Sequence, residues 1–233
     1  MTRAVLFDLD GTLLDTAPDM AAAINELLRE HGRPPLEFTR IRPHVSYGAR
    51  GLVRLAFPEV VDDAAFNTLR LRFLDLYRGL LAAETRLFEG IADALTELEA
   101  RCIPWGIVTN KPGWLTEPLL RELNLDQRAR VVVSADTLAH RKPHPAPLLH
   151  AAEKLGLAPA DCIYIGDAEF DVTAAKAAGM PVFVALFGYI PDDHRPHDWP
   201  ATGWLQSPQE MVTLLASLGQ RERSAATRSA VTT

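Results

Sequence analysis

The stretch AVLFDLDGT, residues 4–12, joins a short apolar run directly to Asp8 and Asp10, two carboxylates separated by one residue. An apolar run of this length that ends in Asp and Gly is typical of a buried strand followed by a turn. Two neighbouring carboxylates repel each other, so their place at a buried strand end indicates a ligand that offsets their charge. In an open parallel sheet, ligands bind beyond the carboxyl ends of the strands. The sequence therefore predicts a functional site at Asp8 and Asp10.

Further apolar runs recur along the chain, and helical patterns alternate with them. This alternation predicts an α/β fold with a doubly wound, Rossmann-like parallel sheet. The remaining predicted strands are 105–109 (WGIVT), 131–135 (VVVSA), 162–166 (CIYIG), 181–187 (PVFVALF) and a weaker 202–206 (TGWLQ).

One segment, residues 16–83, breaks the alternation because its apolar residues follow only helical spacing. We expect it to be a helical insert between the first two strands of a catalytic core formed by 1–15 and 84–218. Thr16 to Asp19 is typical of a capping box at the start of the first inserted helix. The tail 219–233 is polar and rich in small residues, and we expect it to be disordered.

The composition narrows the class of protein. The 233 residues carry a net charge of −6, which argues against general binding to nucleic acid or to a membrane surface, although a local basic patch is compatible with it. No apolar run reaches about 18 residues, so no membrane-spanning helix is expected. Asp8 and Asp10 interrupt the N-terminal apolar run, so it does not resemble a signal peptide. Cys102 and Cys162 are expected to be small buried residues, with a disulfide left open, and the low cysteine content fits the cytoplasm.

The predicted strand ends and the loops beside them carry carboxylates, a lysine, a hydroxyl and an amide, without cysteine or histidine. Oxygen ligands at this density suit Mg²⁺. One carboxylate can attack phosphorus as a nucleophile, while a second protonates the leaving alkoxide and later activates water. Mg²⁺ and the lysine would offset the charge of the phosphate, and Thr109 with loop amides would hold its oxygens. The residues are Asp8, Asp10, Thr109, Asn110, Lys142, Asp167 and Asp171.

Four segments, DLDGT (8–12), TN (109–110), RKP (141–143) and GDAEFD (166–171), resemble the four motifs of the haloacid dehalogenase superfamily in order and spacing. The resemblance implies that the helical insert is a type-1 cap. It also implies the following roles: Asp8 as nucleophile; Asp10 as general acid and base; Thr109, Asn110 and Lys142 as phosphate ligands; Asp8, the Asp10 backbone carbonyl and Asp167 as Mg²⁺ ligands; and Asp171 as their support.

Within this superfamily, VTNKP (108–112), KPHPAPLL (142–149) and GY (188–189) resemble phosphoglycolate phosphatases, including a branch that acts on N-acetylmuramic acid 6-phosphate. The compact cap and LFEG (87–90) also resemble that branch. Ala168 departs from the pattern, since relatives often have a polar residue there. The resemblance implies a Mg²⁺-dependent phosphatase for a small phosphorylated metabolite, with phosphoglycolate first and N-acetylmuramic acid 6-phosphate second.

Other classes of protein remain open at this point. A phosphosugar mutase shares the motifs, whereas a dehalogenase would not need the acid Asp10. A receiver-like module could be phosphorylated on Asp8, but Asp10 as a built-in base would shorten the life of that phosphate. The sequence does not indicate an oligomeric state.

Simpler structural interpretations compete with several of the assigned roles. Asp10 with Gly11 could be only a turn, Lys142 could be a solvated loop lysine, and Asp171 could begin a helix as well as support a metal. Arg141 and Glu169 are expected to be surface residues.

The insert has one further feature, a stretch from Thr39 to Pro58 without any acidic residue. It contains Arg40, Arg42, His44, Arg50 and Arg54. Most of these side chains could form a solvated basic face. Arg50 differs because it follows the loop Ser46–Ala49, which resembles the cap specificity loop of the superfamily. A guanidinium at this place could bind a substrate carboxylate with two parallel hydrogen bonds.

Overall fold

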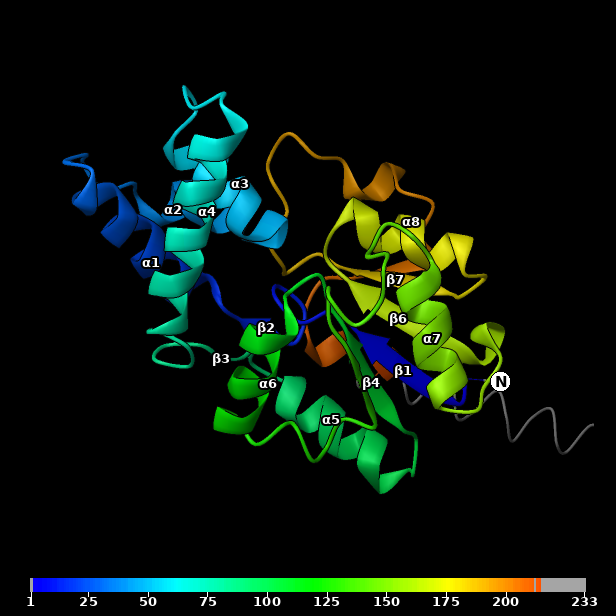
Figure 1. Ribbon diagram of the computed structural model, residues 1–233. Helices are drawn as coiled ribbons and strands as arrows, with labels where there is room; N and C mark the ends of the chain where they lie inside the picture. The colour runs from blue at the N-terminus through cyan, green and yellow to red at the C-terminus, as the bar shows by residue number, and fades with distance from the viewer. Residues whose placement is uncertain (1, 212, 215–233) are drawn as a thin grey trace, which may run out of the picture.

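A computed structural model describes residues 2–211, 213 and 214 of the chain (Figure 1). Its main sheet has six parallel strands in the order β5-β4-β1-β6-β7-β8, and all six predicted strand positions are confirmed. Their bounds are β1 Ala4–Phe7, β4 Trp105–Val108, β5 Val131–Val133, β6 Cys162–Gly166, β7 Val182–Ala185 and β8 Gly203–Leu205. The first strand lies in the middle of the sheet, so the chain that follows it emerges at the centre of the carboxyl edge.

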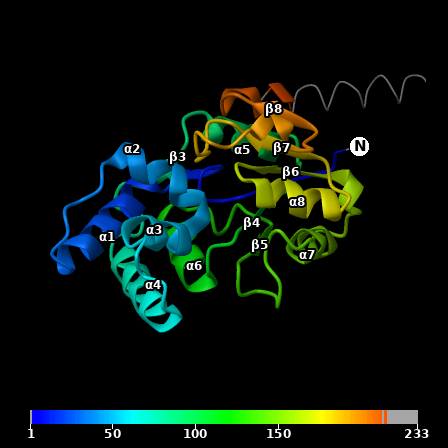
Figure 2. The ribbon, with the colours of Figure 1, turned by 90° about the horizontal axis from the view of Figure 1, so that it is seen from above.

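Helices cover both faces of this sheet, which confirms the doubly wound arrangement (Figure 2). Val5 and Phe7 of β1 pack in one apolar cluster with α5 (Ile91–Ala100) and α6 (Gly113–Glu122). Ala4 and Leu6 pack in another with α7 (Ala146–Lys154) and α8 (Glu169–Ala177). Alternate residues of a strand point to opposite faces, so a strand buried on both sides is apolar throughout.

Four helices follow β1 and lie together at one end of the sheet (Figures 1 and 2). They are α1 (Ala17–Glu30), α2 (Phe38–Ile41), α3 (Gly48–Ala56) and α4 (Asp63–Arg78), with a 3-10 turn at Arg42–Tyr47. They share an apolar core of their own, which is built mainly from α1, α3 and α4. The structure describes all of residues 16–83, and none of them lies in a strand. We refer to this helical unit as the cap; its bounds as a separate domain stay a prediction.

The two connections between the cap and the sheet run side by side. Leu14–Asp15 (β2) pairs antiparallel with Arg86–Leu87 (β3). The predicted capping box is wrong, because the Thr16 side chain makes no capping hydrogen bond. The Asp19 carboxylate instead accepts hydrogen bonds from the backbone nitrogens of Glu84 and Thr85 and from the Thr85 hydroxyl, at 2.7–3.0 Å. Asp19 therefore joins the start of the cap to its end.

The two cysteines and the C-terminal tail were also subjects of sequence-based expectations. Cys162 is buried in β6 as expected, but Cys102 is exposed in the turn after α5, and both thiols are free. The predicted disordered tail, 219–233, lies outside the described residues. None of the described helices is both long and apolar enough to span a membrane.

Candidate active site

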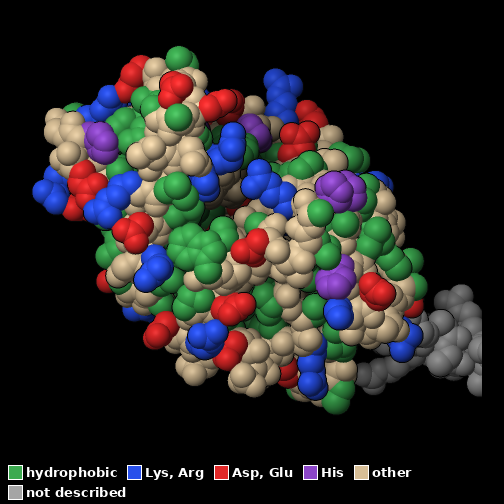
Figure 3. All heavy atoms as spheres, in the orientation of Figure 1, with side chains coloured by type: hydrophobic (Ala, Val, Ile, Leu, Met, Phe, Trp, Pro, Cys, Tyr) green, Lys and Arg blue, Asp and Glu red, His purple; other side chains and the backbone are tan. Residues whose placement is uncertain are grey.

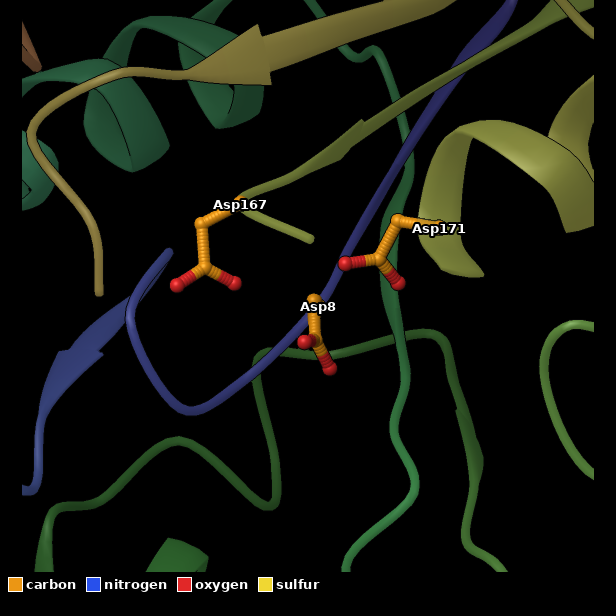
Figure 4. A group of neighbouring side chains, drawn as sticks. All are labelled: Asp8, Asp167 and Asp171. Carbon is orange, nitrogen blue, oxygen red and sulfur yellow. The ribbon is translucent and has the colours of Figure 1, made fainter. Parts of the chain in front are cut away.

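Three buried carboxylates meet at the carboxyl edge of the sheet (Figure 4). Asp8 directly follows β1, Asp167 directly follows the neighbouring strand β6, and Asp171 lies in the first turn of α8. Each offers one oxygen, and these oxygens lie within 4.8 Å of one another. Parallel pairing of β1 with β6 is what brings the first two together, since it aligns the ends of the strands.

Glycines permit this close approach. Gly11 has a φ of +86°, which is accessible mainly to glycine, and a β-carbon there would lie 2.1 Å from Oδ2 of Asp167. A β-carbon at Gly188 would lie 2.3 Å from the β-carbon of Asp167. The turn after β1 and the loop after β7 can therefore both pack closely against the Asp167 side chain, because Gly11 and Gly188 have no side chain.

Lys142 lies inside the carboxylate cluster, so the solvated-loop interpretation is wrong. The residue is 2% exposed, and its Nζ lies 2.8 Å from Asp8 Oδ1 and 2.7 Å from Asp171 Oδ1. It also donates to the Val108 carbonyl at 2.8 Å and to the Tyr164 hydroxyl at 2.7 Å. Burial alone would lower the pKa of Lys142, but its attraction to Asp171 and Asp8 outweighs this and raises it. The lysine therefore keeps its positive charge beside Asp8.

The carboxylates retain an excess of negative charge despite this lysine. Burial, together with repulsion from Asp171 and Asp10, raises the pKa of Asp8 to about 7 even though Lys142 opposes the shift. Burial and repulsion from Asp8 and Asp171 raise the pKa of Asp167 to about 8. Among the described residues, Oδ1 of Asp167 is buried and has no hydrogen-bond partner. A buried, oxygen-only group with an unpaired acceptor fits a hard divalent cation such as Mg²⁺.

Asp171 also holds the start of α8. Its Oδ2 accepts a hydrogen bond from the Ala168 nitrogen at 3.1 Å, while Oδ1 faces Lys142 and lies 3.1 Å from the Tyr164 hydroxyl. Both interpretations of Asp171, as a helix-start residue and as a support of the cluster, are thus compatible with the structure. Ala168, which departs from the superfamily pattern, contributes only its backbone here.

Asp10 is not one of the three clustered carboxylates, and it pairs with a lysine that the sequence interpretation missed. Lys111, from the loop after β4, places Nζ 2.8 Å from Asp10 Oδ1 and 2.9 Å from the hydroxyl of Tyr77 in α4. Burial would lower the pKa of Lys111, but Asp10 and then Tyr77 raise it. Burial also raises the pKa of Tyr77 to about 12. The position of Lys111, immediately after Thr109 and Asn110, was the one signal that could have indicated it.

The other residues predicted to bind phosphate lie beside Asp8. The Thr109 hydroxyl accepts a hydrogen bond from the Lys111 nitrogen at 3.1 Å. The Asn110 side chain donates to the Lys142 carbonyl at 3.0 Å and so ties the loop after β4 to the loop that carries the lysine. The structure thus brings together all seven residues that the sequence predicted at the core of the site.

A cavity of about 540 Å³ lies between these residues and the cap. Its floor contains Asp8, Asp10, Thr109 and Lys142. Figure 3 shows the hollow between the cap and the core, with Lys and Arg side chains gathered at its edge. The cap lines the cavity with Ser46 and Tyr47 of the 3-10 turn and with the first turn of α3, Gly48 to Arg50. One stripe of α4 completes this wall with Asn67, Arg70, Leu74 and Tyr77.

The arginines of the acid-free stretch have separate places. Arg50 lines the cavity and stacks over the Phe66 ring at 5.7 Å. Arg54 packs over the same ring at 4.6 Å. Arg42 donates to the carbonyls of Gly188 and Phe187 at 3.0 and 3.1 Å, which joins the cap to the core. The solvated-face interpretation is therefore wrong for Arg42.

Two smaller observations complete the site. Ser46 donates a 2.6 Å hydrogen bond to Oδ2 of Asp167, so the cap reaches the carboxylate cluster directly. Arg141 is exposed, as expected, but it also lines the cavity, whereas Glu169 is exposed and does not.

Comparisons with known proteins agree with this architecture. The family model of haloacid dehalogenase-like hydrolases matches residues 5–185. A phosphoglycolate phosphatase of Xanthomonas campestris pv. campestris (strain 8004) is 47% identical over 209 residues, covering 90% of this chain and 94% of the relative. An N-acetylmuramic acid 6-phosphate phosphatase of Pseudomonas aeruginosa (strain PAO1) is 39% identical over 213 residues, covering 91% and 94%.

A solved structure shows the same fold. The crystal structure of a predicted phosphoglycolate phosphatase from Haemophilus somnus 129pt superposes with a TM-score of 0.82 at 25% identity, covering 92% of this chain and 98% of that one. The family match spans most of the chain and includes all of the cap. The chain therefore belongs to the haloacid dehalogenase-like hydrolases, as a phosphoric monoester hydrolase of that family.

Proposed function

We propose that this enzyme is a Mg²⁺-dependent phosphatase that hydrolyses 2-phosphoglycolate to glycolate and phosphate through an aspartyl-phosphate on Asp8. One observation carries the proposal: Asp8 lies at the floor of the cavity with the charged Lys142 2.8 Å away and Asp10 two residues further along the chain. A nucleophile, a cation to attract the phosphate and a separate acid thus border the same space.

In the first step, a carboxylate oxygen of Asp8 attacks phosphorus. The new bond between this oxygen and phosphorus forms as the bond to the ester oxygen breaks, and Asp10 gives its proton to the departing alkoxide. The positive charge of Lys142 attracts the phosphoryl oxygens and lowers the repulsion between the two anions. The Thr109 hydroxyl and the Asn110 amide border the same part of the cavity and hold those oxygens.

In the second step, water attacks the phosphorus of the aspartyl-phosphate and Asp10, now a carboxylate, takes a proton from it. The bond between phosphorus and the Asp8 oxygen breaks, so phosphate leaves and the nucleophile is restored. Asp10 can serve both steps because it lines the cavity and its side chain is 16% exposed there.

Asp8, Asp167 and the backbone carbonyl of Asp10 would hold Mg²⁺, with Asp171 as support. When bound, this ion supplies positive charge that offsets the phosphoryl group and the carboxylates. The raised pKa values of Asp8 and Asp167 and the unpaired Oδ1 of Asp167 support this assignment.

The preference for phosphoglycolate rests on relatives and on charge. The phosphoglycolate phosphatase of Xanthomonas campestris is 47% identical over nearly all of both chains. Phosphoglycolate carries a carboxylate besides its phosphate, and Arg50 lines the cavity from the cap. A guanidinium there can bind that carboxylate with two parallel hydrogen bonds.

A specific observation favours N-acetylmuramic acid 6-phosphate as the second candidate. Tyr77 and Arg70 lie on the same stripe of α4, seven residues apart, which corresponds to about 10 Å along the helix. The carboxylate of phosphoglycolate is joined to the carbon that bears the ester, so it stays close to the phosphate. In the sugar acid, the carboxylate lies on an ether far from the phosphate. Arg70, which lines the cavity of about 540 Å³ from α4, suits the distant carboxylate of that longer molecule.

Phosphate release tests the proposal. The purified enzyme with Mg²⁺ is given phosphoglycolate, N-acetylmuramic acid 6-phosphate, hexose phosphates and p-nitrophenyl phosphate, and the ratio kcat/KM is compared. We expect one of the two phosphorylated acids to exceed the hexose phosphates by at least about tenfold, the gain of roughly 1.5 kcal/mol expected from a charged hydrogen bond. Isomerised hexose phosphate without free phosphate would identify a phosphosugar mutase instead.

A further inference from the structure

We propose that Lys111 and Tyr77 form a positioning pair that holds the general acid Asp10 ready for the leaving group and makes its orientation depend on the place of the cap. This inference rests on the proposed phosphatase function, but it concerns two side chains that the mechanism above does not use. Both are buried beside the cavity, and each comes from a different part of the fold.

Lys111 contacts both Asp10 in the core and Tyr77 in the cap. Its side chain is 4% exposed, and Nζ donates to Asp10 Oδ1 at 2.8 Å and to the Tyr77 hydroxyl at 2.9 Å. Its backbone is held as well, because its nitrogen donates to Thr109 Oγ1 and its carbonyl accepts from the Ala135 nitrogen at 3.0 Å. The ammonium group is thus presented to Asp10 from a fixed backbone in the core.

Tyr77 brings the cap into the same contact. It lies near the end of α4, is 1% exposed, and stacks on Phe73 of the same helix with ring centroids 6.2 Å apart. A displacement of α4 from the core would break the hydrogen bond between Tyr77 and Lys111. Lys111 would then lose one of the two groups that fix its ammonium, and the orientation of Asp10 would be less restricted.

The arrangement leaves Asp10 able to react. Oδ1 is taken by Lys111, and within the described part of the chain no side chain or backbone group is hydrogen-bonded to Oδ2. Asp10 is 16% exposed through the cavity that it lines. A carboxyl group held by one oxygen presents the other to the leaving alkoxide in a restricted range of angles, which favours proton transfer.

The test compares leaving groups. Tyr77→Phe removes only the hydroxyl. Lys111→Met removes the ammonium group but keeps a side chain of similar length, and Lys111→Arg keeps the positive charge. Lys154→Met makes the same substitution at an exposed lysine and is the matched control. Glycolate is a poor leaving group that needs a proton, whereas p-nitrophenolate leaves readily without one. Steady-state kcat and KM are measured with both esters, and the first turnover is followed through p-nitrophenolate release.

We expect kcat for phosphoglycolate to fall about tenfold in Tyr77→Phe and about a hundredfold in Lys111→Met, within the range of general acid–base catalysis, while KM changes less than about threefold. The first turnover of p-nitrophenyl phosphate should stay near the wild-type rate. Slow turnover should follow, because Asp10 must still activate water, so the variants should show a burst. Lys111→Arg should recover part of kcat, and the double variant should lose no more than Lys111→Met alone.

Several outcomes would contradict the proposal that Lys111 and Tyr77 position Asp10. An effect on KM alone would mean that Lys111 binds the substrate carboxylate. A loss in the first turnover of p-nitrophenyl phosphate as large as the loss in kcat for phosphoglycolate would mean a general loss of structure. Independent losses that multiply in the double variant would mean separate roles. If Lys111→Met does not fold, as judged by its thermal melting, Tyr77→Phe and Lys111→Arg still decide the matter. A wild-type enzyme inactive on every phosphate ester would instead contradict the proposed function.

Discussion

Replacing Lys142 with methionine should destabilise the metal-free protein more strongly as the pH rises. Methionine has a similar length and shape, so the cavity left behind is small, but the positive charge is lost. Lys142 is 2% exposed and lies 2.8 Å from Asp8 and 2.7 Å from Asp171. Removing it takes away the ion-pair partner that Asp8 and Asp171 share, while the Asp8, Asp167 and Asp171 oxygens stay within 4.8 Å of one another.

The size of the stability loss follows from the burial of the ion pairs that Lys142 forms. Breaking a buried ion pair by removing one partner costs about 3–5 kcal/mol of unfolding free energy. For a chain of this length, each kcal/mol lowers the melting temperature by about 2–4 °C, so the full loss is about 6–20 °C.

The pH dependence has a definite sign. The folded-state pKa values of Asp8 and Asp167, about 7 and about 8, are raised above the unfolded value of 3.8. The raised pKa values therefore contribute to the free energy of unfolding in full below about pH 4, and this stabilising contribution is lost as the pH rises through 7 and 8. Without Lys142 the repulsion grows, so the variant should approach the wild type at about pH 5 and fall furthest below it at about pH 9.

Thermal melting by circular dichroism in EDTA, from about pH 5 to pH 9, measures this difference, with Lys154→Met as the exposed control. A loss below about 2 °C at pH 9, under 1 kcal/mol, would refute the reasoning, as would a loss independent of pH. Either result would mean that the carboxylates do not depend on Lys142 for their charge balance.

The remaining predictions concern the reaction and its ligands. Asp8→Asn should abolish turnover but keep phosphate binding, and residual activity within about tenfold of wild type, a barrier change of only ~1.4 kcal/mol, would contradict a covalent role. A chelator should stop activity, and Mg²⁺ should raise the melting temperature more at about pH 8.5 than at about pH 6, because its carboxylate ligands must lose their protons; Asp167→Ala should remove this increase. Arg50→Ala should lower kcat/KM about ten- to a hundredfold on the preferred phosphorylated acid but hardly on p-nitrophenyl phosphate, and equal losses on both would assign Arg50 to cap structure.

Sequence-based prediction worked best for features that depend on local pattern. The central strands β1, β4 and β6 were predicted because a strand buried on both faces must be apolar over its whole length. The edge strands β5 and β8 are only partly buried, and the signal for β8 was the weaker one. The core of the site followed, because parallel pairing places every strand end at one edge and so brings Asp8, Thr109 and Asp167 together. The helical nature of 16–83 was equally clear from its spacing.

Prediction failed where a side chain could choose between partners distant in sequence. Asp19 has the position of the acidic member of a capping box that begins at Thr16, but its carboxylate accepts hydrogen bonds from Glu84 and Thr85 at the other end of the cap domain. Cys102 was expected to be buried at a strand start, yet it occupies an exposed turn with a φ of +54°. The partners of Asp19 are distant in sequence, so the local pattern could not indicate them. The turn at Cys102 is a local helix end, closed by hydrogen bonds from the Cys102 and Ile103 nitrogens to α5, which the sequence analysis assigned to a strand start instead.

Hydrophobic periodicity and motif spacing are properties of short segments, so they were enough to predict the sheet, the helical insert and the set of carboxylates at the strand ends. In contrast, the burial of Lys142 between Asp8 and Asp171 and the link that Lys111 makes between Asp10 and Tyr77 arise from the packing of the folded chain. Tyr77 and Lys111 are separated by the whole of α5 and β4, and the packing of the cap against the core alone brings them within hydrogen-bonding distance. Hydrogen bonds and ion pairs act over a few ångströms in space, so their partners are set by how separate elements pack and not by the residues that surround each one in the chain.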